Sequence, residues 1–297
     1  MADSTQTATR GVNEPAGIVA TPSAAPIGAE VHGVDLRESL GNEAFARIRA
    51  LFDRHAVIVL RGQCISPEAL AAFSARFGEL EVHHLTEHVL PHLPQVRVLS
   101  NVKKAGRGIG MTRGGMHWHS DLSYKRVPAS ATLLYGIECP PEGADTQFAD
   151  MCTAYETLPE DIRARIRGRR AVHDRNYRYS ALYPDRPAFT PEQLAKVPPV
   201  EHPVVRLHPA TGRKALFIAR DLVSGIVGID GAEGRNLIET METIATRPQL
   251  VYSHRWQVGD VLIWDNSRLL HRATPYDNRF NRTLYRTQVA GTVPVPV

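Results

Sequence analysis

The feature that most constrains this chain is a series of short apolar runs, separated by turn residues, that begins at Val96. The runs are 96–99, 131–135, 204–207, 215–218, 261–264 and 283–287. Runs of this length are typical of buried β-strands, because the helices of globular proteins are longer. Many short strands with a few helices predict a mainly β protein with helical covers, built as a double-sheet jelly roll.

Helices are expected to cover the sheets at 42–54, from Ser66 onward, at 153–167 and at 230–245. Asn42 is the expected N-cap of the first helix, and Ser66 caps the second, because Ser at the cap and Pro at the next position favour a helix start. The residues 56–60 between these two helices predict a fully buried strand. Residues 175–200 are rich in proline and are expected to form a long loop, a candidate lid.

The length and composition indicate one large core. With 297 residues, 43% of them hydrophobic, the chain is long enough for a single β-rich enzyme domain. Residues 1–24 are rich in Ala, Thr, Ser, Pro and Gly, and they predict a flexible N-terminal tail. Residues 25–297 are expected to form the single folded domain.

Charge and cysteine content exclude several classes of protein. The net charge of +4 is small, and the basic stretch 163–170 lacks interleaved aromatic residues, so no nucleic-acid partner is expected. Cys64, Cys139 and Cys152 are odd in number and far apart, which favours a reducing compartment over a disulfide framework or a cysteine zinc site. No apolar stretch approaches the length of a membrane span, so the sequence predicts a cytoplasmic protein with no membrane partner.

A possible metal site begins at His119-Ser120-Asp121. In a strand, two side chains two residues apart project from the same face, so His119 and Asp121 can hold one ion. His271 follows a buried strand and is the best third ligand. Two imidazoles and one carboxylate form the facial triad of non-haem iron(II) oxygenases. By itself an H-x-D tripeptide is more often structural, and His117 offers a competing pair.

Two arginines near the C-terminus point to anions. Arg282 and Arg286 lie in a run that favours a strand, where they are expected on a common face. Guanidinium groups bind carboxylates in a bidentate manner, so two inward arginines beside a metal favour two bound anions over surface ion pairs. One anion would be a 2-oxo acid and the other an acidic group of the substrate.

From about Gly28 to Gly291 the chain resembles the TauD/TfdA family, the taurine and 2,4-dichlorophenoxyacetate dioxygenases. The motifs that carry the resemblance are, in order, Gly28–Leu36, Phe77–Leu80, Trp118–Asp121, Gly143–Thr146, Ala154–Pro159, His202–Arg206 with His208–Pro209, Trp264–Asn266 with His271, and Arg282 with Arg286. The resemblance implies a double-stranded β-helix core. Ala144 replaces a usual glycine and Ser267 a usual arginine, but neither position is an expected ligand.

The resemblance also implies a set of roles. The implied ligands of Fe(II) are His119, Asp121 and His271, while Thr146 and Arg282 would hold the distal carboxylate of the cosubstrate 2-oxoglutarate. Arg286 would bind the acidic group of the substrate, and His83 and Asn101 are candidate substrate contacts. The implied reaction consumes O2, releases succinate and CO2, and hydroxylates a small anionic organic molecule that is a carboxylate, a sulfonate or a sulfate ester. A homo-oligomer, a dimer or a tetramer, is the expected assembly.

Two other functions compete with this hypothesis. A zinc-type metallohydrolase would use the same histidines to activate water, but it gives no role to Arg282 and Thr146. A non-catalytic ligand-binding jelly roll would typically lack a metal ligand, whereas all three candidates are present.

Overall fold

The computed structural model describes residues 17–82, 88–112 and 114–292. Its largest element is an eight-stranded sheet. In spatial order the strands are β1 (Val19–Pro22), β2 (Ala29–His32), β3 (Val57–Leu60), β16 (Val261–Asp265), β8 (Ala131–Glu138), β18 (Thr283–Val289), β5 (Leu93–Ser100) and β4 (Val89–Leu90). Strands β2 and β3 pair in parallel, and the other neighbours are antiparallel.

Smaller sheets complete the β structure. Three strands form the sheet that carries part of the site: β15 (Val251–His254), β9 (Thr146–Asp150) and β17 (Leu269–Ala273). The remaining strands are β11 (Val200–Pro203), β10 (Arg170–His173) and β14 (Val223–Ile226) in one sheet, β12 (Val205–Leu207) with β13 (Lys214–Leu216), and β6 (Lys103–Lys104) with β7 (Arg107–Gly108). The described chain is therefore mainly sheet, as the sequence predicts.

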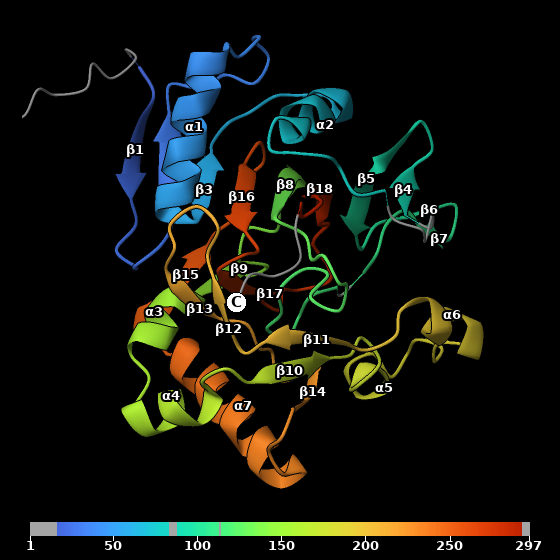
Figure 1. The fold of residues 1–297 in the computed structure, drawn as a ribbon. Coiled ribbons are helices and arrows are strands. Elements are labelled where there is room, and N and C mark those ends of the chain that lie inside the picture. Colours follow the sequence, from blue (N-terminus) through green and yellow to red (C-terminus); the bar gives the residue numbers. More distant parts are fainter. Residues whose placement is uncertain (1–16, 83–87, 113, 293–297) are drawn as a thin grey trace, which may run out of the picture.

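Helices cover both ends of this arrangement (Figure 1). Helices α1 (Asn42–His55) and α2 (Pro67–Ala75) lie along the large sheet at the top of the view, and α3 (Met151–Glu156), α4 (Glu160–Ile166) and α7 (Gly231–Ala245) lie at the opposite end. Two short helices, α5 (Tyr179–Leu182) and α6 (Pro191–Lys196), lie within 175–200, and a 3-10 helix spans Pro248–Leu250. None of the helices in the described part of the chain is long and apolar enough to cross a membrane.

The alternation of side chains along the large sheet separates two cores. In β16, Val261 and Ile263 pack with α1 and α2, whereas Leu262 and Trp264 pack toward the smaller sheet that contains β9 and β17. This alternation follows from the two-residue period of a strand. The same rule gives β8, β18 and β5 one inner face that looks toward the smaller sheet, and the candidate site lies on that side.

Several local predictions are confirmed and some are wrong. The Ser66 side chain accepts a hydrogen bond of 3.2 Å from the Ala69 N–H at the start of α2, as predicted. The N-cap of α1 is Gly41 instead of Asn42, and the amide oxygen of Asn42 accepts a hydrogen bond from Arg76 instead. The helix predicted over 153–167 is two helices, because Pro159 disfavours helical geometry at the residue before it.

The predicted N-terminal tail and the predicted loop at 175–200 both contain regular structure. Residues 19–22 of the predicted tail form β1, which pairs with β2 along its whole length, so the described structure begins before residue 24. Residues 1–16 lie outside the described residues. The loop predicted at 175–200 contains α5 and α6, and a capping box at Thr190 and Gln193 stabilises the start of α6.

Candidate metal centre and its surroundings

His119, Asp121 and His271 come together at the inner side of the smaller sheet. The backbones of the two histidines form an isolated antiparallel bridge, in which each N–H donates to the carbonyl of the other at 3.0 and 2.8 Å. His271 belongs to β17, whereas Asp121 lies in a turn, so the strand predicted for 119–121 is wrong beyond the bridge. One ligand atom of each of the three side chains lies within 4.8 Å of the other two, close enough for one ion.

A hydrogen bond orients the imidazole of His119, and both rings face Asp121. His119 Nδ1 donates to the carbonyl of His117 at 2.8 Å, which leaves Nε2 facing Asp121 Oδ1 at 3.9 Å. His271 Nε2 lies 3.7 Å from Asp121 Oδ2. Burial, with a smaller contribution from His119, lowers the pKa of His271 well below its ordinary value. The buried imidazole is therefore neutral, the form that a metal ion requires.

Asp121 is buried and held by its neighbours. Thr132 Oγ1, from the inner face of β8, donates to Asp121 Oδ2 at 2.7 Å. Burial by itself would raise the pKa of Asp121, but His271, Arg286, His119 and Thr132 stabilise the carboxylate and bring its pKa to about 2. The carboxylate is thus ionised over the whole physiological range, and its two oxygens lie 3.9 Å from His119 Nε2 and 3.7 Å from His271 Nε2.

Asn266 links the carboxylate to the turn between β16 and β17. Its side-chain nitrogen donates to Thr132 Oγ1 at 2.9 Å, while its side-chain oxygen accepts from Trp264 Nε1 at 3.0 Å and from the Asp121 N–H at 3.3 Å. Ser120 Oγ donates to the Asn266 carbonyl at 2.9 Å. The candidate site is therefore fixed by a connected set of hydrogen bonds around one buried amide.

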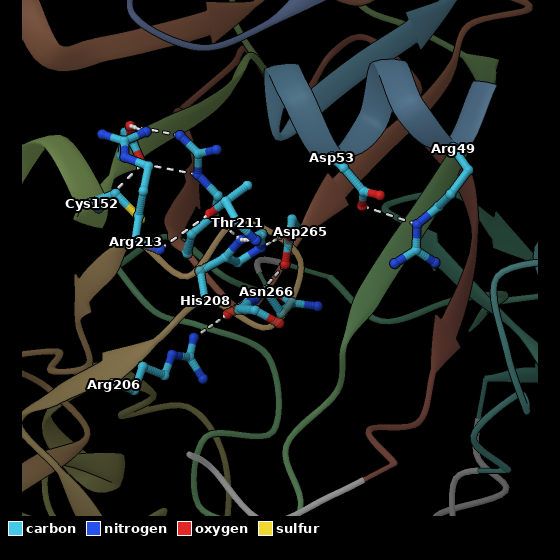
Figure 2. Close-up of polar contacts among 12 residues, drawn as sticks. Arg49, Asp53, Cys152, Arg206, His208, Thr211, Arg213, Asp265 and Asn266 are labelled. Carbon is cyan, nitrogen blue, oxygen red and sulfur yellow. Dashed lines mark hydrogen bonds and ion pairs between the residues drawn. The ribbon is translucent and has the colours of Figure 1, made fainter. Parts of the chain in front are cut away.

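A second layer of contacts supports this turn, as Figure 2 shows. His208 Nε2 lies 2.6 Å from Asp265 Oδ2, and the Arg206 guanidinium donates to the Asn266 carbonyl. Burial would raise the pKa of Asp265, but the hydrogen bond and charge of His208 lower it below its ordinary value. Arg206 and His208 belong to the motifs His202–Arg206 and His208–Pro209, which carry the family resemblance. Their structural role was not predicted from the sequence.

The two residues predicted to hold 2-oxoglutarate flank Ala273. Arg282, directly before β18, lines a small cavity together with Leu99, Met111, Ala273 and Tyr276. Thr146 is the cross-strand partner of Ala273, and its hydroxyl accepts a hydrogen bond from Trp256 Nε1 at 3.0 Å. The hydroxyl proton of Thr146 remains available, because a hydroxyl both accepts and donates. No described carboxylate forms an ion pair with Arg282.

Arg286 points at the carboxylate of the metal centre. Its Nη1 lies 3.8 Å from Asp121 Oδ1, and its side chain is 14% exposed. Directly across the strand pair, Arg97 of β5 is the register partner of Arg286. Neither Arg97 nor Thr132 is among the site residues predicted from the sequence. A signal was present for both, since each is a polar residue inside an apolar strand run.

The other candidate substrate residues have different positions. Asn101 uses its amide on the backbone that leads into β18: its oxygen accepts from the Arg282 N–H at 2.8 Å and its nitrogen donates to the Phe280 carbonyl at 2.9 Å. His83 lies outside the described residues. The competing ligand His117 is not part of the metal group; its ring lies beside those of His119 and Tyr183.

Known proteins are similar to this chain over nearly its whole length. The family model described as "Taurine catabolism dioxygenase TauD, TfdA family" matches residues 20–288. The alpha-ketoglutarate-dependent 2,4-dichlorophenoxyacetate dioxygenase of Cupriavidus pinatubonensis is 36% identical over 280 residues, which cover 91% of this chain and 96% of the relative. The alpha-ketoglutarate-dependent sulfate ester dioxygenase of Pseudomonas putida is 32% identical over 282 residues, covering 93% and 90%.

A solved structure agrees with the sequence comparisons. AAD-2 in complex with Mn(II) and N-oxalylglycine has 30% sequence identity and a TM-score of 0.79, and the match covers 94% of this chain and 100% of that one. The chain therefore belongs to the TauD/TfdA family of dioxygenases. It is an oxidoreductase that depends on Fe(II), 2-oxoglutarate (alpha-ketoglutarate) and O2. These relatives support a dioxygenase over a metallohydrolase or a non-catalytic binding module.

Proposed function

We propose that His119, Asp121 and His271 hold Fe(II) and that the enzyme hydroxylates a small anionic organic molecule with release of succinate and CO2. The observation that carries the proposal is the buried group of two imidazole nitrogens and one carboxylate within 4.8 Å of one another. That donor set suits a non-haem iron(II) site with open coordination positions. The Nε2 atoms of His119 and His271 lie 3.9 and 3.7 Å from the two oxygens of Asp121, so the three candidate ligand atoms converge on one point.

We assign the cosubstrate to the cavity beside Ala273. The Arg282 guanidinium would pair with the distal carboxylate of 2-oxoglutarate, and the free proton of the Thr146 hydroxyl would donate to the same group. Burial lowers the pKa of Arg282 from its ordinary value, as expected for a cation that a bound anion would stabilise. When bound, Fe(II) supplies the activation of O2 that couples oxidation of 2-oxoglutarate to hydroxylation of the substrate.

The chain itself provides binding, orientation and exclusion of water. Arg286 would hold the acidic group of the substrate next to the metal, and Thr132 and Asn266 would orient the Asp121 carboxylate. Tyr183 and Arg186 of the 175–200 segment contact His117 and the Thr112 carbonyl, respectively, so this segment would cover the site. A small anionic substrate is supported by the relatives, whose names specify a phenoxyacetate and a sulfate ester.

The remaining structural assignments are also proposals. We assign the two facing sheets to a jelly roll, or double-stranded β-helix, since β16 and β17 carry core side chains toward one another. Residues 25–297 would form one domain, and β1, which pairs with β2, would add a strand from the preceding residues. The assembly would be a homo-oligomer, a dimer or a tetramer, and the compartment would be the cytoplasm, as the three separated free cysteines suggest.

An anaerobic titration tests this function. Addition of Fe(II) and then 2-oxoglutarate to the metal-free enzyme should produce a weak visible charge-transfer band, and the His271→Ala variant should give none. Turnover, measured as succinate release, should require O2. Absence of the band in the wild-type enzyme, or product formation without O2, would refute the assignment and favour a zinc-type metallohydrolase.

A further inference from the structure

Two guanidinium groups lie side by side on the inner face of the large sheet. Arg97 of β5 and Arg286 of β18 are direct cross-strand partners. Leu99 and Leu284, two residues away in each strand, pack into the core between the sheets, so alternation places both arginines on that same inner face. The candidate metal centre is on this side, since Arg286 reaches Asp121.

This pair is electrostatically unfavourable as it stands. Like charges directly opposite one another destabilise a strand pair. Burial, followed by the charge of Arg286, lowers the pKa of Arg97 to about 10, so both groups remain charged at neutral pH. The Nε atoms of both arginines are buried without a hydrogen-bond partner. Buried donors without a partner are costly unless a ligand satisfies them.

No carboxylate among the described residues compensates Arg97. Arg286 has one acidic neighbour, Asp121, and that carboxylate belongs to the metal group. Tyr124 lies near both arginines, but burial raises the pKa of its phenol, so it stays neutral. Arg175 and Arg186 of the 175–200 segment add further positive charge around Arg97. Among the residues that the structure describes, the surroundings of the pair are thus positive and contain no counter-ion for Arg97.

A charge count shows what is missing. In the loaded enzyme of the proposed function, the charges of Fe(II) and Arg282 are balanced by those of Asp121 and doubly negative 2-oxoglutarate. The charges of Arg97 and Arg286 remain. A singly charged carboxylate, sulfonate or sulfate ester would neutralise only one of them, and a buried net charge is unfavourable.

We propose that Arg97 and Arg286 form a two-arginine clamp that selects a doubly charged oxyanion, such as a phosphate monoester or a phosphonate, as the anionic group of the substrate. The inference rests on the proposed function, because it takes Arg286 as the substrate anchor. Tetrahedral oxyanions offer three acceptor oxygens, enough for a bidentate contact with each of two guanidiniums when one oxygen is shared. With Arg286 alone, the site would pair one guanidinium with the substrate anion; Arg97 adds the second guanidinium.

A matched pair of ligands tests the clamp. Hexyl phosphate and hexyl sulfate have the same chain and a tetrahedral head, but at about pH 8 the phosphate carries close to two negative charges and the sulfate one. Binding of each to the Fe(II)·2-oxoglutarate enzyme is measured by calorimetry without O2. We expect hexyl phosphate to bind roughly tenfold or more tightly than hexyl sulfate, because its second negative charge strengthens the hydrogen bonds to the second guanidinium.

Variants assign the preference to Arg97. Arg97→Met, which keeps the length but removes the charge, should bind both ligands alike, whereas Arg97→Lys should retain part of the preference. Arg54→Met removes an exposed charge from α1 and should leave the ratio unchanged. The charge-transfer band with 2-oxoglutarate should be the same in all four proteins.

The outcomes separate the two proposals. If the band forms and hexyl phosphate fails to bind more tightly than hexyl sulfate, the clamp is refuted while the proposed function stands. A preference that survives in Arg97→Met also refutes the clamp. If the wild-type enzyme gives no band, the proposed function itself fails.

Discussion

Thr132 donates a hydrogen bond of 2.7 Å to Asp121 Oδ2, the carboxylate oxygen that lies 3.7 Å from Nε2 of His271. The Thr132 hydroxyl in turn accepts from Asn266 at 2.9 Å, so its single proton must point at the carboxylate. Asp121 lies in a turn instead of a strand, and this contact with β8 is what fixes its side chain relative to the two histidines.

Replacing Thr132 should therefore weaken metal binding. Thr132→Val keeps the shape and removes the hydroxyl, and we expect the affinity for Fe(II) to fall roughly 10- to 100-fold, the usual cost of losing an outer hydrogen bond to a metal ligand. Thr132→Ser should be close to wild type. Anaerobic calorimetric titration with Fe(II) measures the effect, and equal affinities in Thr132→Val and wild type would show that the contact does not orient Asp121.

Substitution of each of the three proposed ligands should abolish activity, whereas substitution of the neighbouring His117 should not abolish Fe(II) binding. His119→Ala, Asp121→Ala and His271→Ala should each abolish succinate release. His117→Ala is the matched control: His119 Nδ1 donates to the backbone carbonyl of residue 117, a contact that the substitution leaves in place. We expect His117→Ala to retain Fe(II) binding, measured by titration, and full activity in any of the three ligand variants would remove that residue from the metal site.

Replacing Arg282, directly before β18, and replacing Arg286, within β18, should affect different Michaelis constants. Arg282→Met should raise the KM for 2-oxoglutarate by roughly 10- to 100-fold, because a charge-assisted contact with the distal carboxylate is lost. Arg286→Met should instead raise the KM for the substrate and leave that for 2-oxoglutarate nearly unchanged. Steady-state kinetics with each compound varied in turn makes the comparison, and the reverse pattern would mean that the roles are exchanged.

Asn101 should act through Arg282 instead of through the substrate. Its amide bonds the backbone of residues 280 and 282, so Asn101→Ala releases the segment that carries the Arg282 guanidinium. We expect a several-fold rise in the KM for 2-oxoglutarate with little change in the KM for the substrate. Asn101→Asp keeps the acceptor for the Arg282 N–H and should recover part of the loss. A selective rise in substrate KM would instead support the substrate contact implied by the sequence resemblance.

The His208–Asp265 pair should contribute to stability in a pH-dependent way. The folded-state pKa of Asp265 is below its ordinary value of 3.8, so the ionised carboxylate stabilises the fold above pH 3.8. That contribution disappears as the pH falls below 3.8 through the folded-state pKa. Asp265→Asn should lower the free energy of unfolding by about 2 kcal/mol at neutral pH. Urea denaturation should show the difference from wild type shrinking below pH 3.8, and a difference independent of pH would contradict the pair.

Local patterns in the sequence were enough to predict the strands and the ligand types. The runs 131–135, 261–264 and 283–287 all lie in strands, because a short, mostly apolar run bounded by turn residues is typical of a buried strand. His119, Asp121 and His271 do come together. The strand predicted to place His119 and Asp121 on one face, however, does not extend to Asp121. A turn after a single bridge, and not a strand, brings Asp121 to the same ion site as His119.

What the sequence did not reveal depends on long-range register. Arg97 and Arg286 are distant in the chain, and only the pairing of β5 with β18 makes them neighbours. In the same way, nothing local connects Thr132 with Asp121 or Asn101 with Arg282, because each contact joins segments that meet only after the sheets form. Register depends on the packing of the whole sheet, and local patterns in the sequence do not reveal which residues of distant strands become partners.

The backbone hydrogen bonds between His119 and His271 bear on how the enzyme loses and regains its iron. The N–H of each residue donates to the carbonyl of the other, and these bonds involve no imidazole atom, so we expect exchange of the metal to leave the backbones of the two histidines in place. Reactivation by fresh ferrous ion then requires only rebinding, with no refolding step. We therefore expect enzyme treated with a chelator to regain its activity when ferrous ion is added, without denaturation and renaturation.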